Sequence, residues 1–145
     1  MSTTIVPAVF VLFEKDGKVL LVLRENTGWS DGMYTMPAGH VEIHETFRQA
    51  AVREAQEEVG LTVQLDNLEH RLTLNEIKPD EDRIGMTLQA TKWKGEAYNA
   101  EPHVHGEVAW FDVDNLPSNM VPQALFSLEQ INAGKAYAEF FTPSA

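Results

Sequence analysis

Three glutamates near the middle of the chain have a spacing suited to holding a metal ion. Glu54, Glu57 and Glu58 are three and four residues apart, so on a helix, which turns about 100° per residue, their side chains lie within an arc of roughly 100°. Like charges at this spacing repel, and no lysine stands within four residues of any of them. A divalent cation such as Mg²⁺ or Mn²⁺, which prefers oxygen ligands, would relieve the repulsion and bind phosphate oxygens. The alternative is an acidic helix face that contacts only water.

The segment that carries these glutamates has the sequence signals of a helix with defined ends. Thr46 can cap the first turn, and Gln49, three residues on, can reach back to complete a capping box. Gly60 stands where the helix should end, because the left-handed conformation costs glycine little. Apolar residues recur every four positions and form a narrow stripe, made of Phe47, Ala51, Ala55 and Val59. Glu54 and Glu58 project beside this stripe, so we expect partly buried carboxylates that need a counter-charge.

The remaining segments predict several strands and a second helix. Residues 5–13 and 18–23 are apolar and β-branched on either side of a turn sequence at residues 14–17, which predicts a hairpin. Residues 26–39 contain glycine, proline and short polar side chains without a regular period, which predicts a long ordered loop. Further strands are expected at residues 62–75, 84–93 and 108–112, and a helix at residues 123–133. The tail after Tyr137 is expected to fray.

Length and composition restrict the classes of protein that fit. The 145 residues are expected to form one domain, residues 1–145. Lys and Arg number 11 against 22 Asp and Glu, and the net charge of −11 has the wrong sign for binding duplex nucleic acid. The absence of cysteine excludes disulfides, cysteine-ligated zinc and thiol nucleophiles. The longest apolar run, residues 8–13, is far shorter than the ~20 residues that span a bilayer, and there is no basic N-terminal segment, so we expect a cytoplasmic protein with no membrane partner.

The glutamates also belong to a longer pattern. Gly39 is followed after five residues by Glu45, and after seven more by the segment Arg53-Glu54-Ala55-Gln56-Glu57-Glu58-Val59-Gly60-Leu61. This pattern resembles, element for element, the box that defines the Nudix hydrolases, with mild departures at His44 and Ala55. Residues 34–42 are similar to the usual lead-in of that family. The resemblance implies an α/β fold, a three-layer α/β/α sandwich around a mixed β-sheet, and hydrolysis of a nucleoside diphosphate linked to another group.

The resemblance assigns roles to the residues of the box. Its glutamates would be metal ligands and act in catalysis, which here means Glu54, Glu57 and Glu58. The backbone carbonyl of Ala38 would complete the coordination of Mg²⁺ or Mn²⁺. Arg53 would orient a glutamate through paired hydrogen bonds, with Glu45 as its expected partner. Structural support would come from Gly39, Glu45 and Gly60.

Residues outside the box receive roles by the same resemblance. A further carboxylate acts in this family as a base or extra ligand, and the loop at residues 94–106 offers Glu101, with Glu107 as second choice. Arg24 resembles a position that contacts substrate phosphate in MutT-like members, where a plain surface arginine is the alternative. Asn119 stands where such members present an asparagine to a purine edge.

Histidines and aromatic residues near these positions have simpler interpretations. His103 and His105 alternate as on a strand, but without a cysteine or a third close histidine we expect polar loop residues rather than zinc ligands. Trp29, Tyr34 and Trp93 could each stack on a nucleobase, and for each taken singly we expect packing in the core or at its rim.

The leading hypothesis is a metal-dependent pyrophosphohydrolase that cleaves a nucleoside triphosphate, with oxidised or otherwise non-standard ones included, to a monophosphate and pyrophosphate. An ADP-ribose or dinucleoside polyphosphate hydrolase is the nearest alternative. A nucleotide sensor without catalytic activity is the alternative from another functional class. The expected partner is a small nucleotide, and a homodimer stays open. The nucleobase is not decided by the sequence.

Overall fold

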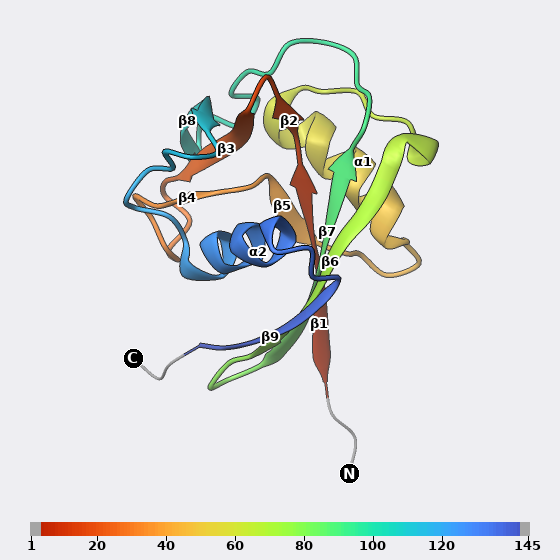
Figure 1. Cartoon of the computed structure of the whole chain (residues 1–145), viewed down its shortest axis with the longest axis vertical. Helices are drawn as coiled ribbons and strands as arrows, with labels where there is room; N and C mark the ends of the chain where they lie inside the picture. The colour runs from red at the N-terminus through yellow and green to blue at the C-terminus, as the bar shows by residue number, and fades with distance from the viewer. Residues whose placement is uncertain (1–3, 143–145) are drawn as a thin grey trace.

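A mixed sheet of five strands lies at the centre of the computed structural model, which describes residues 4–142 (Figure 1). The strand order is β5-β1-β7-β6-β9. β1 (Ile5–Leu12) runs parallel to β7 (Asp82–Ala90) and antiparallel to β5 (Ala38–His40). β6 (Leu68–Ile77) pairs antiparallel with β7 and parallel with β9 (Tyr137–Phe141).

A second sheet stands beside the first and is built around β3 (Lys18–Arg24). This strand pairs antiparallel with three others, β2 (Glu14–Lys15), β4 (Tyr34–Thr35) and β8 (His105–Asp112). The β3–β8 register shifts between Leu23 and Arg24, which pairs with His105. The bulge marks the end of β3 where Arg24 and His105 are brought together.

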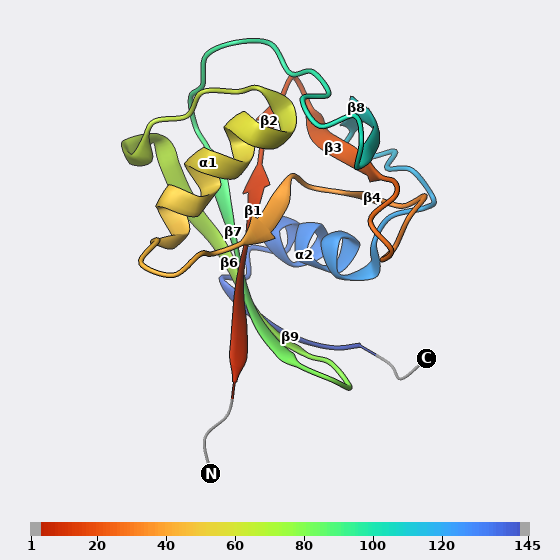
Figure 2. The ribbon, with the colours of Figure 1, turned by 180° about the vertical axis from the view of Figure 1, so that it is seen from behind.

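Two helices cover opposite faces of the central sheet (Figures 1 and 2). They are α1 (Phe47–Val59) and α2 (Pro122–Asn132), and a short 3₁₀ turn, η1 (Leu65–Asn67), precedes β6. Successive side chains of β1 point to opposite faces of the sheet, as the two-residue period of a strand requires. Val9 and Val11 pack in the core beneath α1, whereas Leu12 packs in the core beneath α2. The expected α/β arrangement with helices on both sides of a mixed sheet is confirmed.

The ends of α1 follow the signals in the sequence. The backbone N–H of Gln49 donates to Thr46 Oγ1 at 3.0 Å, and the backbone N–H of Thr46 donates to Gln49 Oε1 at 2.9 Å. Gly60 has a φ of +69° at the C-terminal cap, and a side chain there would overlap the ring of Tyr98. The turn at the start of the helix and the glycine at its end therefore fix which residues α1 contains.

The predicted hairpin between residues 5–13 and 18–23 is wrong for most of its length. β1 is bordered by β5 and β7 on its two edges, so β3 has no edge to pair with and joins the other sheet. Only a short hairpin remains, in which Glu14 and Lys15 pair with Val19 and Lys18.

Other boundaries also differ from expectation. The tail after Tyr137 does not fray over its described part, because β9 adds to the edge of β6 and buries Ala138. The strand expected at residues 62–75 is broken by η1. The expected loop at residues 26–39 is ordered and contains β4 and the start of β5, and β8 begins three residues earlier than predicted. Between residues 4 and 142, no helix has the length and apolar character needed to cross a membrane.

Candidate metal centre and substrate cleft

Two of the three glutamates of α1 are almost completely buried against β5. Glu54 and Glu58 each have 8% of their surface exposed, whereas the side chain of Glu57 is 48% exposed. Oε2 of Glu58 accepts a hydrogen bond of 2.8 Å from the backbone N–H of Ala38. The Glu54 carboxylate lies so close to Gly39 that any side chain at Gly39 would overlap it. The approach of Glu54 is thus a physical reason for glycine at this position.

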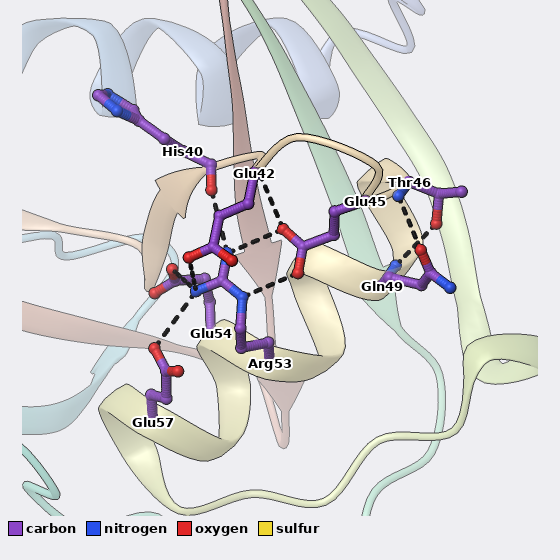
Figure 3. A network of polar contacts seen from close by, with 8 residues as sticks. All are labelled: His40, Glu42, Glu45, Thr46, Gln49, Arg53, Glu54 and Glu57. Carbon is purple, nitrogen blue, oxygen red and sulfur yellow. Dashed lines mark hydrogen bonds and ion pairs between the residues drawn. The ribbon is translucent and has the colours of Figure 1, made fainter.

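The guanidinium of Arg53 holds the surrounding carboxylates together (Figure 3). Nε and Nη2 donate to the two oxygens of Glu45 at 2.8 and 2.9 Å, so the expected ion pair is present and bidentate. Nη1 donates to Glu54 at 2.6 Å and to Glu57 at 3.3 Å, and Nη2 also donates to the carbonyl of His40 at 3.1 Å. The hydrogen bonds from Arg53 lower the pKa of Glu45 to about 2. Arg53 therefore fixes α1 glutamates relative to the loop before the helix.

Positive charge from Arg53 does not balance the cluster. Burial raises the pKa of Glu54 to about 7, although the hydrogen bond and charge of Arg53 act in the opposite direction. Burial also raises the pKa of Glu58, and the neighbouring charge of Glu54 adds to this effect. When the pKa of a carboxyl group is raised in this way, the positive charge around it is too small to offset burial and the neighbouring negative charge. The two buried glutamates thus have the electrostatics of a site that a cation would stabilise.

The loop between β7 and β8 and the first residue of β8 bring two more groups to the cluster. The backbone N–H of Ala100 donates to the carbonyl of Glu58 at 3.2 Å, which attaches this loop to the end of α1. One donor atom from each of Glu58, Glu101 and His105 lies within 4.8 Å of the other two. Burial and the charge of Glu57 raise the pKa of Glu101. The loop carboxylate preferred from the sequence therefore lies beside the box glutamates.

His105 is not the polar loop residue that the sequence pattern suggested. It is the first residue of β8, and only 5% of its surface is exposed. Burial lowers the pKa of His105, as does the charge of Arg24, so both favour the neutral form of the ring. Its Nδ1 has no hydrogen-bond partner among residues 4–142. The strand-like alternation of His103 and His105 was the one signal in the sequence for this position.

A cleft of about 270 Å³ adjoins the carboxylate cluster. Its wall includes Ala38, Gly39 and His40 of β5, the strand that also donates to Glu58. Further lining comes from distant parts of the chain and includes Phe10, Arg24, Trp29, Glu76, Arg83 and Gln123. Sequence reasoning missed the last three of these, because only the packing of β6, β7 and α2 brings them together. The cleft and the cluster share β5 as a common wall.

Arg24 lies in the cleft at the end of β3, the place expected for a phosphate-binding arginine. Its Nε donates to the carbonyl of Trp29 at 2.8 Å, and Nη2 donates to Thr27 at 3.0 Å. The guanidinium carbon stands 4.6 Å from the centre of the Trp29 ring. Burial lowers the pKa of Arg24, while the charges of Asp31 and Glu58 act to raise it. The loop at residues 26–33 thus holds this cation next to the cluster.

Several residues singled out from the sequence have other contacts. Nδ2 of Asn119 donates to the carbonyl of Gly32 at 2.8 Å, and Asn119 is exposed and absent from the lining of the cleft. Glu107, the second choice of base, accepts a hydrogen bond of 3.0 Å from the hydroxyl of Tyr34. Trp93 packs against the core beneath α1, as expected, whereas Trp29 lines the cleft and is 40% exposed.

Comparison with known families agrees with this geometry. The model of the NUDIX domain matches residues 3–131. The chain belongs to the NUDIX domain family. Two of its solved relatives come from bacteria. The MutT NUDIX hydrolase of Burkholderia pseudomallei has a TM-score of 0.80 at 25% identity, covering 88% of this NUDIX chain and 98% of that one. The NUDIX hydrolase of Nitrosomonas europaea has a TM-score of 0.75 at 22% identity, covering 99% of this chain and 82% of that one.

Curated relatives of this NUDIX chain have two different names. An ADP-ribose pyrophosphatase of Methanocaldococcus jannaschii is 34% identical over 113 residues, which is 77% of this chain and 65% of that protein. The NAD-capped RNA hydrolase NudC of Shigella dysenteriae is 32% identical over 118 residues, which is 81% of this chain and 43% of that protein. The chain therefore spans less than two thirds of the length of either relative.

The donor set of this NUDIX chain fits a divalent cation. Oxygen donors from Glu54, Glu57 and Glu58 lie on one side of α1, and Glu101 approaches from the facing loop. Burial is the main cause of the raised pKa values of Glu54 and Glu58, and the negative charge of neighbouring carboxylates, Glu101 among them, raises both further. Hard oxygen donors in excess of nearby cations are the ligands that Mg²⁺ and Mn²⁺ prefer.

Proposed function

We propose that this NUDIX chain is a divalent-metal-dependent pyrophosphohydrolase that converts a nucleoside triphosphate to a nucleoside monophosphate and pyrophosphate. The observation that carries the proposal is that the glutamate cluster and the cleft meet at Ala38. This residue lines the cleft, and its backbone N–H donates to Glu58 at 2.8 Å. A nucleotide bound in the cleft could therefore extend its phosphates to the glutamates. The volume of about 270 Å³ suits one nucleoside better than two.

In this proposal the box glutamates and the Ala38 carbonyl would hold Mg²⁺ or Mn²⁺. The bound cation would neutralise charge on the phosphates, polarise their oxygens and lower the pKa of water. Arg53 keeps Glu54 and Glu57 in place through its Nη1, and the Arg53–Glu45 pair fixes the guanidinium itself.

The proton and the phosphates are handled by residues outside the box. A carboxylate oxygen of Glu101 accepts a proton from the water that attacks phosphorus, and the raised pKa of Glu101 suits a base acting nearer to neutral pH. Arg24 pairs with a phosphate oxygen in the cleft. The water oxygen forms the new bond to phosphorus, the anhydride P–O bond breaks, and pyrophosphate leaves with the electron pair of that bond.

A second candidate is hydrolysis of ADP-ribose or of a dinucleoside polyphosphate. The name of the Methanocaldococcus jannaschii relative favours this substrate class, and that of NudC raises NAD-capped RNA as a further member of it. The same cluster could cleave any of these pyrophosphates. The net charge of −11 weighs against affinity for a long nucleic acid and therefore favours small nucleotides.

The test is a substrate panel with the purified protein in Mg²⁺ and, separately, in Mn²⁺. The panel contains standard and oxidised nucleoside triphosphates, ADP-ribose, NAD⁺ and diadenosine polyphosphates, and products are separated by chromatography. Pyrophosphate and monophosphate in equal amounts from a triphosphate are the expected result. Two monophosphates from ADP-ribose, with no turnover of triphosphates, would instead establish the second candidate.

A matched pair of variants separates catalysis from folding. Glu57→Gln should abolish turnover and leave the unfolding transition unchanged, since Glu57 is half exposed on α1. Glu69→Gln, a change of the same kind at an exposed position of β6, should leave turnover unchanged. Full activity of Glu57→Gln would refute the proposed metal site, and binding of nucleotides without turnover by the unmodified protein would indicate a sensor.

A further inference from the structure

Glu76 is a buried carboxylate that lines the cleft and is not one of the carboxylates of α1. It lies near the end of β6, has 4% of its surface exposed and lines the cleft together with Gln123 of α2. Because a carboxylate oxygen enclosed without a donor is costly, each oxygen of so buried a side chain should meet either a donor or an open cavity. The contacts of its two oxygens are therefore informative.

The two oxygens of Glu76 are in different situations. Oε2 accepts from Nε2 of Gln123 at 3.0 Å and from the hydroxyl of Thr142 at 2.8 Å. Oε1 accepts no hydrogen bond from any group among residues 4–142, and it is not an enclosed atom, so it is open to the cleft. One oxygen thus fixes the side chain between β6, α2 and the residue after β9, and the other is unmatched at the cleft.

The arginine opposite Glu76 in the strand pair does not bind the free oxygen. Glu76 and Arg83 are directly opposite each other in the β6–β7 register, and both line the cleft. Arg83 nevertheless forms its ion pair with Glu81, at 2.8 Å from Nε and 2.6 Å from Nη2. The cleft therefore presents a hydrogen-bond acceptor that no donor of the described chain satisfies.

We propose that Glu76 is a specificity-determining residue whose Oε1 accepts a hydrogen bond from the exocyclic amino group of a nucleobase. This inference rests on the proposed function, because it places the base in the same cleft whose β5 wall adjoins the glutamate cluster. An ionised carboxylate accepts hydrogen bonds and cannot donate them. It therefore matches an amino group and repels the carbonyl oxygen that replaces that group in a deaminated base.

Gln123 can add a second hydrogen bond to the same nucleobase. Its Nε2 uses one hydrogen on Glu76 and retains another, which can be donated to an acceptor on the base. Adenine, cytosine and guanine each place an acceptor atom on the same edge as the amino group. A site built for a hydrogen bond discriminates strongly against the analogue that lacks it, because a buried group is then left unpaired.

The experiment measures binding of monophosphate pairs that differ in one amino group. Dissociation constants are obtained by calorimetry, in EDTA, for AMP against IMP, CMP against UMP and GMP against XMP. The unmodified protein should bind the amino member of at least one pair roughly tenfold to a hundredfold more tightly than its oxo partner. Glu76→Gln, whose amide can also donate, should reduce that ratio to near one. Glu139→Gln, an exposed change on the neighbouring β9, should retain it.

The outcomes separate this inference from the proposed function. Equal affinity for the amino and oxo members of all three pairs overturns the role of Glu76, and this comparison needs only the unmodified protein. A retained ratio in a folded Glu76→Gln protein overturns it as well. Because no turnover is required, selective binding without hydrolysis would support the role of Glu76 and refute the hydrolase, whereas hydrolysis without selectivity would do the reverse.

Discussion

Nε2 of His105 lies 3.7 Å from Oε1 of Glu58, too far for a hydrogen bond, although both residues are more than nine-tenths buried. The other ring nitrogen, Nδ1, has no partner within residues 4–142. A buried polar atom without a partner lowers stability. The position of His105 beside Glu58 of the candidate metal centre therefore lowers the stability of the folded protein.

The first prediction concerns this cost. His105→Leu should leave the free energy of unfolding in EDTA unchanged, or raise it by about 1–3 kcal/mol, because an unmatched buried nitrogen is removed. The same change should weaken Mn²⁺ binding, since His105 has a donor atom within 4.8 Å of those of Glu58 and Glu101. Urea unfolding and calorimetric titration measure the two effects, with His70→Leu on β6 as an exposed control. Lower stability with unchanged Mn²⁺ affinity would assign His105 to packing alone.

The second prediction concerns pH. In the folded chain the pKa of Glu54 is about 7, compared with an ordinary value of 4.5. Between these values the folded state keeps a proton that the unfolded state loses, so the Glu54 contribution to stability is present below the window and lost as pH rises through it. The melting temperature of the metal-free protein should therefore fall less steeply across this window in Glu54→Gln, whose amide does not titrate. Identical slopes would show that Glu54 ionises normally.

The affinity for Mn²⁺ should depend on pH in the opposite direction to the stability of the metal-free protein. Mn²⁺ binds the ionised form of Glu54, so its affinity should increase as pH rises toward and past about 7, with proton release on binding. Calorimetry in buffers of different ionisation enthalpy measures the released protons. Glu69→Gln should release as many protons as the unmodified protein, and Glu54→Gln fewer.

The features that the sequence predicted well depend on neighbours along the chain. The capping box of Thr46 and Gln49, the glycine after Val59 and the spacing of the glutamates all act within one helix. α1 was therefore placed with its correct ends. The Arg53–Glu45 pair spans eight residues and followed from the family pattern rather than from physics alone.

The structural features that the sequence did not predict depend on which segments, distant along the chain, pair with each other. The apolar patterns of β1 and β3 are compatible with a hairpin as well as with the observed pairing. The hairpin is excluded only because β5 and β7 pair with both edges of β1. His105 is buried because β8 pairs with β3, and Glu76 lines a cleft because α2 packs against β6. Apart from the strand-like alternation of His103 and His105, these contacts leave no periodic signal in the sequence.

The third prediction tests the close approach at β5. Gly39→Ala should destabilise the protein by about 1–3 kcal/mol, because the new methyl group would overlap the Glu54 carboxylate. Turnover should fall as well, since Glu54 would be displaced from the cluster. Adding Glu54→Asp to Gly39→Ala shortens the carboxylate by one methylene and should recover most of the stability without recovering turnover. A single Gly39→Ala protein as stable and active as the unmodified one would contradict the described geometry.

The fourth prediction separates the charge of Arg53 from its shape. Arg53→Lys keeps the positive charge but cannot donate to both oxygens of Glu45 and also to Glu54, as the guanidinium does at 2.8, 2.9 and 2.6 Å. Loss of these charged hydrogen bonds should reduce kcat/KM roughly tenfold to a hundredfold. The loss should appear mainly in kcat, because Arg53 positions the glutamates and is not among the residues that line the cleft. Arg48→Lys, elsewhere on α1, serves as the matched control. If Arg53→Lys raised KM with kcat unchanged, Arg53 would instead act in substrate binding.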